Sequence, residues 1–283
     1  MTDSGQVREP EIKKEEILRL SDPDFNSNNV CIVTGATSGI GRALAVAAAA
    51  NGLLVVGLGR SEQAGKEAVE IAREMGGIME FVQGDLTRDE NIEEAVKQAA
   101  ELGAIKYLAN IAGVQNVCPI EDFPMDKYDY MQRLMIRAPF YLSKLVIPHM
   151  KNSPHGKGVI GSIGSIHAHV CTLNKSVYSM TKFAIRGLTQ SISAEGAGKI
   201  RAFSVTVPYT KTPLVLNQIP DQARSRNITP EQVVKDVMLG RARVKEMMTP
   251  IEAANLFMFG FSEHAKFLVG GDLMVDAGIT LTY

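Results

Sequence analysis

A serine, a tyrosine and two lysines lie close together in residues 164–182, which read GSIHAHVCTLNKSVYSMTK. Tyr178 and Lys182 are four residues apart, so on a helix their side chains share a face. A tyrosine hydroxyl has a pKa of about 10 in water, and a neighbouring ammonium lowers that pKa by favouring the phenolate. Ser165 can hold a substrate carbonyl through a hydrogen bond. These residues predict proton transfer to or from a substrate oxygen, with Tyr178 as the general acid or base.

A glycine-rich motif, TGATSGIG at residues 34–41, lies between a β-branched run and an alanine-rich segment. Gly35, Gly39 and Gly41 allow a tight turn and let the backbone approach a pyrophosphate at a helix N-terminus. A glycine-rich turn alone is weak evidence, because many turns need glycine only for its backbone freedom. Its position between a strand and a helix favours a dinucleotide site.

Alternating strand-like and helix-like patterns must position these two motifs. Strand-like runs cover residues 29–35, 53–59, 79–85, 106–113, 158–165, 201–207 and 272–278. Helical patterns lie between them, up to about residue 50 and around 67–74, 91–101, 127–150 and 176–195. This alternation predicts an α/β fold with a doubly wound parallel sheet, covered by helices on both faces.

Two segments lie outside this alternation. We predict that residues 1–28 form an exposed N-terminal appendage and that residues 29–283 form a single domain. Within that domain, residues from about 213 to 245 interrupt the strand series with a helical pattern. We expect this segment to be a lid over the substrate site.

Composition narrows the class of partner. The 30 basic and 31 acidic residues nearly cancel, and no Lys/Arg-rich block suggests a nucleic acid or an anionic membrane as partner. The charged N-terminus does not resemble a signal peptide, and the three cysteines lack the spacing of metal ligands. We therefore expect a soluble, cytoplasmic protein that acts on a small molecule and contains no metal.

Together, the motifs resemble those of the short-chain dehydrogenase/reductase family. The resemblance runs from about Asn29 to the C-terminus and rests on TGxxxGxG, GDL at 84–86, NIAG at 110–113, Ser165, YxxxK, Thr212 and VDAG at 275–278. It implies a Rossmann-type sheet and hydride transfer between NAD or NADP and an alcohol or ketone. It also implies a homo-oligomer, either a tetramer or a dimer.

The resemblance assigns roles to individual residues. Tyr178 is implied as the general acid or base, Lys182 as the ligand of the nicotinamide ribose that also lowers the tyrosine pKa, and Ser165 as the residue that orients the substrate. Asp85 and Leu86 are implied at the adenine, and Thr212 at the carboxamide. The implied cofactor-binding residues are Gly35, Thr37, Ser38, Gly39, Ile40, Gly41, Arg60, Asp85, Leu86, Asn110, Ala112, Gly113, Tyr178, Lys182 and Thr212.

Three segments resemble the D-3-hydroxybutyrate dehydrogenases within this family: residues 110–124, 165–178 and 212–224. In that group four side chains bind the substrate carboxylate, and the corresponding residues here are Gln115, His167, Lys175 and Gln218. A lysine charge and neutral donors can fix the carboxylate of a small 3-oxo acid while its carbonyl faces Ser165 and Tyr178. His169 is given no role by this resemblance.

Other positions depart from the family pattern and leave alternatives open. Met135 stands where the family places an asparagine that supports a water-linked proton relay, and a thioether cannot replace an amide. Ile111 also replaces the second asparagine of the usual NNAG, and Val207–Pro208 stands in place of the usual Pro-Gly before the lid. One alternative is therefore a cofactor-binding relative with little turnover and a sensor or scaffold role; the other is a reductase of an uncharged ketone.

The residues at the end of the second predicted strand bear on cofactor choice. NAD-preferring relatives often carry an acidic residue there, whereas this chain has Gly59 followed by Arg60. A guanidinium can bind the 2′-phosphate of NADP, so we predict a slight preference for NADP over NAD. Arg60 could equally stack on the adenine or face solvent.

Overall fold

Apolar and β-branched runs form seven parallel strands in the computed structural model, which describes residues 10–281. The strands are β1 (Asn29–Thr34), β2 (Leu54–Gly59), β3 (Ile78–Gln83), β4 (Ala104–Asn110), β5 (Gly158–Ile163), β6 (Ile200–Thr206) and β7 (Asp272–Met274). Their order across the sheet is β3-β2-β1-β4-β5-β6-β7. Every residue of β1, β5 and β6 is buried, as expected for parallel strands covered on both faces. The predicted doubly wound, Rossmann-type fold is confirmed.

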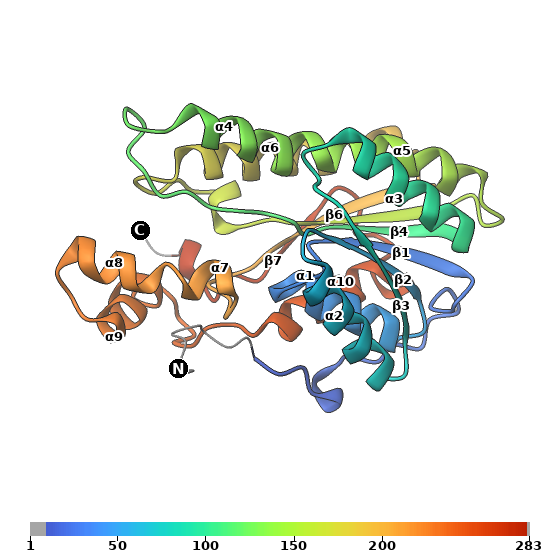
Figure 1. Cartoon of the computed structure of the whole chain (residues 1–283), viewed down its shortest axis with the longest axis horizontal. Helices are drawn as coiled ribbons and strands as arrows, with labels where there is room; N and C mark the ends of the chain where they lie inside the picture. Colours follow the sequence, from blue (N-terminus) through green and yellow to red (C-terminus); the bar gives the residue numbers. More distant parts are fainter. Residues whose placement is uncertain (1–9, 282–283) are drawn as a thin grey trace.

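Helices form a layer on each face of the sheet (Figure 1). One layer contains α1 (Gly39–Ala50), α2 (Glu62–Glu74) and α10 (Pro250–Phe261). The other contains α3 (Asp89–Leu102), α4 (Met125–Gln132), α5 (Ala138–Asn152) and α6 (Ser176–Glu195). None of the helices in the described residues has both the length and the apolar character needed to cross a membrane.

The strand order reverses direction between β1 and β4, which are neighbours in the sheet. In open parallel sheets the loops at the carboxyl ends of the strands diverge at such a point and leave a crevice for a ligand. The glycine-rich turn follows β1, and the NIAG motif includes the last residue of β4. The fold therefore places both motifs at one edge of the sheet.

The segment predicted as a lid is helical and projects beside the sheet (Figure 1). It contains α7 (Pro213–Leu216), α8 (Ile219–Arg226), α9 (Pro230–Gln232) and a π-helical stretch, η4 (Val233–Met238). Ala223, Val233 and Met238 belong to a small apolar cluster of this segment, separate from the two clusters that flank the sheet. Helix α7 borders the crevice, since Pro213, Leu214 and Val215 line it.

Residues 10–28, which we predicted to form an exposed N-terminal appendage, are mostly exposed but are anchored to the domain. Ile12, Ile17 and Phe25 are buried in the apolar cluster that contains α1 and α10. Asn51, the residue after α1, and Asn255 of α10 accept hydrogen bonds from backbone N–H groups of this segment at 3.0 and 2.9 Å. The three apolar residues are widely spaced among charged ones, so the sequence pattern did not show that they form an anchored strap. The first nine residues lie outside the described part of the chain.

Candidate active site

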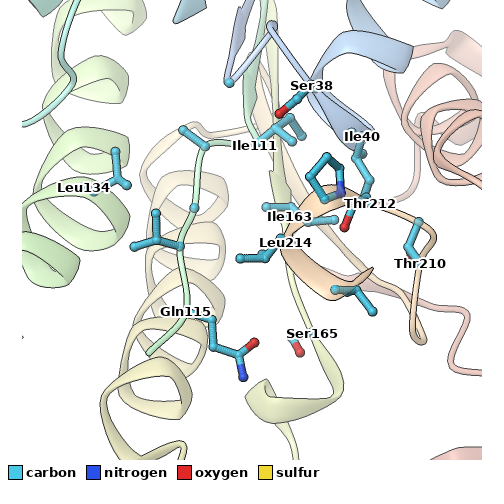
Figure 2. Close-up of a pocket in the computed structure, with 18 of the residues that line it drawn as sticks. Ser38, Ile40, Ile111, Gln115, Leu134, Ile163, Ser165, Thr210, Thr212 and Leu214 are labelled. Atoms are coloured by element: carbon cyan, nitrogen blue, oxygen red, sulfur yellow. The ribbon is translucent and has the colours of Figure 1, made fainter. Parts of the chain in front are cut away.

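A single cavity at the carboxyl ends of the strands collects nearly all the predicted site residues (Figure 2). The predicted residues that line it are Gly35, Thr37, Ser38, Gly39, Ile40, Gly41, Arg60, Asp85, Leu86, Ala112, Gly113, Gln115, Ser165, His167, Lys175, Tyr178, Lys182 and Thr212. Asn110 and Gln218 are the two predicted residues outside its wall. Segments that are far apart in the sequence therefore form one continuous binding crevice.

The glycine-rich turn forms a tight backbone cradle that has no room for side chains at its glycines. Gly39 adopts a left-handed φ of +54°, and a Cβ atom on Gly41 would lie 2.2 Å from the Gly35 carbonyl oxygen. Thr34 ties this turn to the NIAG segment, since its Oγ1 accepts the Ile111 N–H at 2.8 Å. The N-terminus of α1 follows directly, and the positive end of the helix dipole there favours an anion. These features fit the dinucleotide that the sequence predicts.

Tyr178 and Lys182 lie on one face of α6, as their spacing predicts. The Lys182 Nζ is 5.4 Å from the centre of the Tyr178 ring and donates to the Ile163 carbonyl at 2.9 Å. Burial lowers the pKa of Lys182 to about 8. Burial raises the pKa of Tyr178 to about 12, although a hydrogen bond with Ser165 opposes that shift. Tyr178 is therefore protonated at neutral pH in the free protein and is able to donate a proton.

The residues present fit a nicotinamide cofactor. An ammonium has three donors, of which the Ile163 carbonyl takes one from Lys182, so the hydroxyl groups of a ribose can take the others. When bound, the cofactor supplies or accepts the hydride. In the oxidation direction, Tyr178 would act as the base, and its phenolate would be favoured by a positively charged nicotinamide ring bound nearby.

A polar subsite adjoins Ser165 and Tyr178. The side-chain Nε2 of Gln115 is buried and has no hydrogen-bond partner in the structure. Figure 2 shows the Gln115 amide and the Ser165 hydroxyl at the same end of the cavity. A buried amide donor without a partner is costly, so this geometry favours a ligand acceptor at that end.

His167 joins the subsite as a neutral side chain. Its Nδ1 is 3.1 Å from Ser165 Oγ, and its Nε2 is 2.9 Å from Thr172 Oγ1. Burial, together with the charges of Lys175 and Lys182, lowers the pKa of His167 to about 4. The ring is therefore uncharged at neutral pH and serves as a hydrogen-bonding group.

Lys175 contributes the positive charge of this subsite. Its Nζ lies 5.8 Å from the centre of the Tyr209 ring, which also lines the cavity. Burial and, to a smaller extent, the charge of Arg226 lower the pKa of Lys175 to about 8. Among the described residues that line the cavity, Asp85, where the family resemblance implies the adenine, is the only acidic one. The substrate end is therefore suited to an anion.

Two predicted residues have other contacts. The Gln218 amide donates to the Leu214 carbonyl, one turn earlier in the lid segment, so it does not reach the subsite. Asn110 lies behind the cavity wall, with its Nδ2 3.4 Å from Ser162 Oγ. The resemblance to the D-3-hydroxybutyrate dehydrogenases implied Gln218 at the substrate carboxylate, but the direction of its side chain depends on how the lid helices pack.

Met135 is buried beside the cavity, in a π-helical stretch, η2 (Arg133–Arg137), that joins α4 to α5. Its Sδ accepts the Val114 N–H at 3.4 Å. At this position the family resemblance implies a relay asparagine, whereas the Met135 thioether accepts one weak hydrogen bond and cannot donate one. Sequence reasoning missed the π-helical stretch, because an extra residue in a turn leaves no periodic signal.

Two tyrosines that line the cavity were not predicted. Tyr209 lies beside Lys175, and the Tyr130 hydroxyl is 3.0 Å from Nη1 of Arg60. Tyr209 immediately follows Val207–Pro208, where the chain departs from the family pattern. That departure was the one sequence feature that could have indicated Tyr209 as a site residue. Tyr130 comes from α4 and reaches the site only through the tertiary fold.

Comparisons with known proteins agree with this geometry. The family model for short chain dehydrogenase matches residues 29–223. The chain is 34% identical to a D-beta-hydroxybutyrate dehydrogenase from Rhizobium meliloti (strain 1021) over 253 residues, which cover 88% of this chain and 97% of that protein. A second D-beta-hydroxybutyrate dehydrogenase, from Cupriavidus necator, is 32% identical over 257 residues, covering 89% and 98% of the two chains.

Solved structures show the same fold. The L-sorbose reductase of Gluconobacter frateurii, complexed with NADPH and L-sorbose, superimposes with a TM-score of 0.84 at 25% identity, covering 92% of this chain and all of that one. A putative NAD(P) dependent gluconate 5-dehydrogenase from Beutenbergia cavernae, with bound NADP, gives a TM-score of 0.81 at 26% identity with the same coverage. The chain belongs to the short-chain dehydrogenase family and is an NAD(P)-dependent oxidoreductase.

Proposed function

We propose that this enzyme transfers a hydride between NADP(H) and a small 3-oxo or 3-hydroxy acid of the acetoacetate and 3-hydroxybutyrate type. The observation that carries the proposal is the subsite beside Ser165, where a buried Gln115 amide without a partner accompanies the Lys175 ammonium. A carboxylate satisfies the amide donor and the ammonium together.

The proposed reduction balances a hydride with a proton. The hydride adds to the carbonyl carbon of the substrate, and Tyr178 donates its phenolic proton to the carbonyl oxygen. Ser165 and Tyr178 hold that oxygen by hydrogen bonds, while Lys175 and Gln115 hold the carboxylate at the other end. The likeness to two D-beta-hydroxybutyrate dehydrogenases supports this substrate class.

The surroundings of Arg60 support NADP as the preferred cofactor. A Cβ atom on Gly59 would lie 2.5 Å from Cγ2 of Thr37, so an acidic side chain, as in many NAD-preferring relatives, does not fit there. Arg60 lines the cavity, and its guanidinium can bind a 2′-phosphate. Both structural neighbours named above were solved with NADP or NADPH.

A second candidate is the reduction of an uncharged ketone. The likeness to an L-sorbose reductase favours it, and so does the position of Gln218, which leaves the subsite one donor short of the set predicted for a carboxylate. A sensor or scaffold role with little turnover, suggested by Met135, is the remaining alternative.

Steady-state rates with matched substrates distinguish these candidates. Acetoacetate and an uncharged methyl ketone of similar size are offered with NADPH and with NADH, and nicotinamide absorbance is followed. The proposal expects the highest kcat/KM for acetoacetate with NADPH. A faster uncharged ketone would support the second candidate, and cofactor binding without turnover of any substrate would support the sensor role.

We also propose that the enzyme forms a dimer or tetramer. Phe140 on α5 and Phe183 on α6 are 58% and 45% exposed in the single chain, and such apolar side chains favour burial against a second copy. Light scattering after size-exclusion chromatography tests this, and a monomeric mass would contradict it.

A further inference from the structure

His169 and Asp272 form a polar pair behind the catalytic serine. They are 103 residues apart in sequence, and His169 Nε2 lies 2.7 Å from Asp272 Oδ2. Their side chains are 20% and 13% exposed, and neither residue lines the cavity. The pair is therefore placed to act on the site through other residues.

The residues between Ser165 and His169 form a short 3₁₀ turn, η3 (Ile166–Ala168). Ser165 comes directly before this turn, and His167 lies within it. Ser165 caps the turn, with its Oγ accepting the His167 N–H at 3.2 Å. The same Oγ is 3.1 Å from the His167 ring. The direction of the serine hydroxyl therefore depends on the conformation of this turn.

Asp272 holds the far end of the turn against the edge of the sheet. Its Oδ1 accepts from Ser204 Oγ at 2.7 Å, and its Oδ2 accepts from Thr206 Oγ1 at 2.8 Å. Both donors lie on β6, which pairs with β7. The carboxylate is thus fixed by two hydroxyl groups before it binds His169.

Arg186 of α6 holds the other side of the turn. Its Nη1 is 3.5 Å from Nδ1 of His169 and 3.5 Å from the Ala168 carbonyl oxygen. A guanidinium only donates, so Nδ1 must accept and a neutral His169 carries its proton on Nε2, directed at Asp272. This tautomer satisfies both ring nitrogens at once.

Thr206 connects the pair to the beginning of the turn. Its Oγ1 lies 3.4 Å from the Ser165 carbonyl oxygen as well as 2.8 Å from Asp272. The cluster therefore contacts the turn at Ser165, at Ala168 and at His169.

We propose that Asp272 and His169 are positioning residues, which fix this turn so that the Ser165 hydroxyl and the His167 ring face the substrate carbonyl. The inference uses the family's hydride-transfer activity and holds for any carbonyl substrate that the enzyme reduces. A misplacement of a catalytic group by about 1 Å can reduce a rate by about 10²-fold. Loss of the contacts that hold this turn is therefore expected to lower kcat measurably.

Single and double variants test the proposal with the substrate that the wild-type enzyme reduces fastest. His169→Ala and Asp272→Ala each lower kcat by about tenfold or more, because the serine is no longer fixed. The double variant is no slower than the slower single variant, because the two residues act as one unit. His169→Gln, whose amide can donate to Asp272, recovers most of the rate.

Cofactor affinity and a control variant separate positioning from a general structural role. The Kd for NADPH stays at the wild-type value in each variant, since the cofactor cradle lies at β1 and β4. Ser204→Ala removes one bond to Asp272 but leaves both links to the turn, so it has little effect on kcat. Wild-type kcat in His169→Ala, or rate losses that multiply in the double variant, would overturn the proposal.

Hydrogen exchange provides a readout that does not need turnover. In the NADPH complex, His169→Ala speeds amide exchange in a peptide covering residues 164–174 and leaves the peptide covering α1 unchanged. Unchanged exchange in the first peptide would contradict the anchor. A wild-type enzyme that fails on acetoacetate but passes this test would refute only the proposed substrate.

Discussion

Replacing Lys175 by methionine separates the charge of this side chain from its bulk. Methionine keeps an unbranched apolar side chain but removes the ammonium, which lies 5.8 Å from the centre of the Tyr209 ring. The Lys175 pKa of about 8 means that most molecules carry the charge at pH 7, so the substitution deletes a charge-assisted hydrogen bond to a bound carboxylate. Such a bond contributes about 2 kcal/mol.

That free energy corresponds to a fall of about 30-fold in kcat/KM for acetoacetate. Most of the loss is expected in KM, because the carboxylate is bound equally in the ground state and the transition state. The matched uncharged ketone should keep its wild-type kcat/KM. The assay is the initial rate of NADPH oxidation at pH 7 for both substrates.

Lys211 provides the matched control for this substitution. It is an exposed lysine one residue before Thr212 and does not line the cavity, so Lys211→Met should leave both substrates unchanged. Equal losses for the acid and the ketone in Lys175→Met would refute the carboxylate subsite and assign Lys175 a structural role.

Four further predictions follow from the same geometry. Tyr178→Phe lowers kcat by at least about 10²-fold with little change in NADPH affinity, since only the transferable proton is removed; a near-normal rate would disprove the acid/base assignment. Arg60→Ala weakens NADPH binding by about tenfold or more and NADH binding far less, and equal losses in a fluorescence titration would argue against the 2′-phosphate contact. Met135→Asn raises kcat if an amide restores a proton relay, whereas an unchanged kcat at normal cofactor affinity would indicate another route. The ratio of kcat/KM for the acid to kcat/KM for the ketone stays constant below pH 8 and falls above it, because Lys175 loses its charge there. Lys182 has a similar pKa, but its deprotonation affects both substrates alike. A ratio that does not change with pH would contradict the assignment of Lys175 to the carboxylate.

The sheet and the catalytic helix could be predicted because their signals are local. Helix α6 begins and ends at Ser176 and Glu195, where the periodic pattern places it. The strands of a covered parallel sheet are continuous apolar runs, which stand out against the helices between them. The glycine-rich turn and YxxxK could likewise be placed because each lies at a junction between two such elements.

Features that depend on contacts between distant segments could not be predicted. The N-terminal strap is held by Asn51 and Asn255, and isolated residues such as Ile12 give no periodic signal of burial. The direction of Gln218 depends on the packing of the lid helices. The His169–Asp272 pair joins a turn to a sheet edge 103 residues away, so no spacing rule could show it.

The structure of a ternary complex tests the central claim most directly. Tyr178→Phe enzyme, which binds both molecules without turnover, is crystallised with NADP⁺ and 3-hydroxybutyrate. We predict that the carboxylate lies within hydrogen-bond distance of Lys175 Nζ and Gln115 Nε2, with the hydroxyl group at Ser165 and the adjacent carbon facing the nicotinamide. A carboxylate directed toward solvent or toward another part of the cavity would contradict the proposed substrate class.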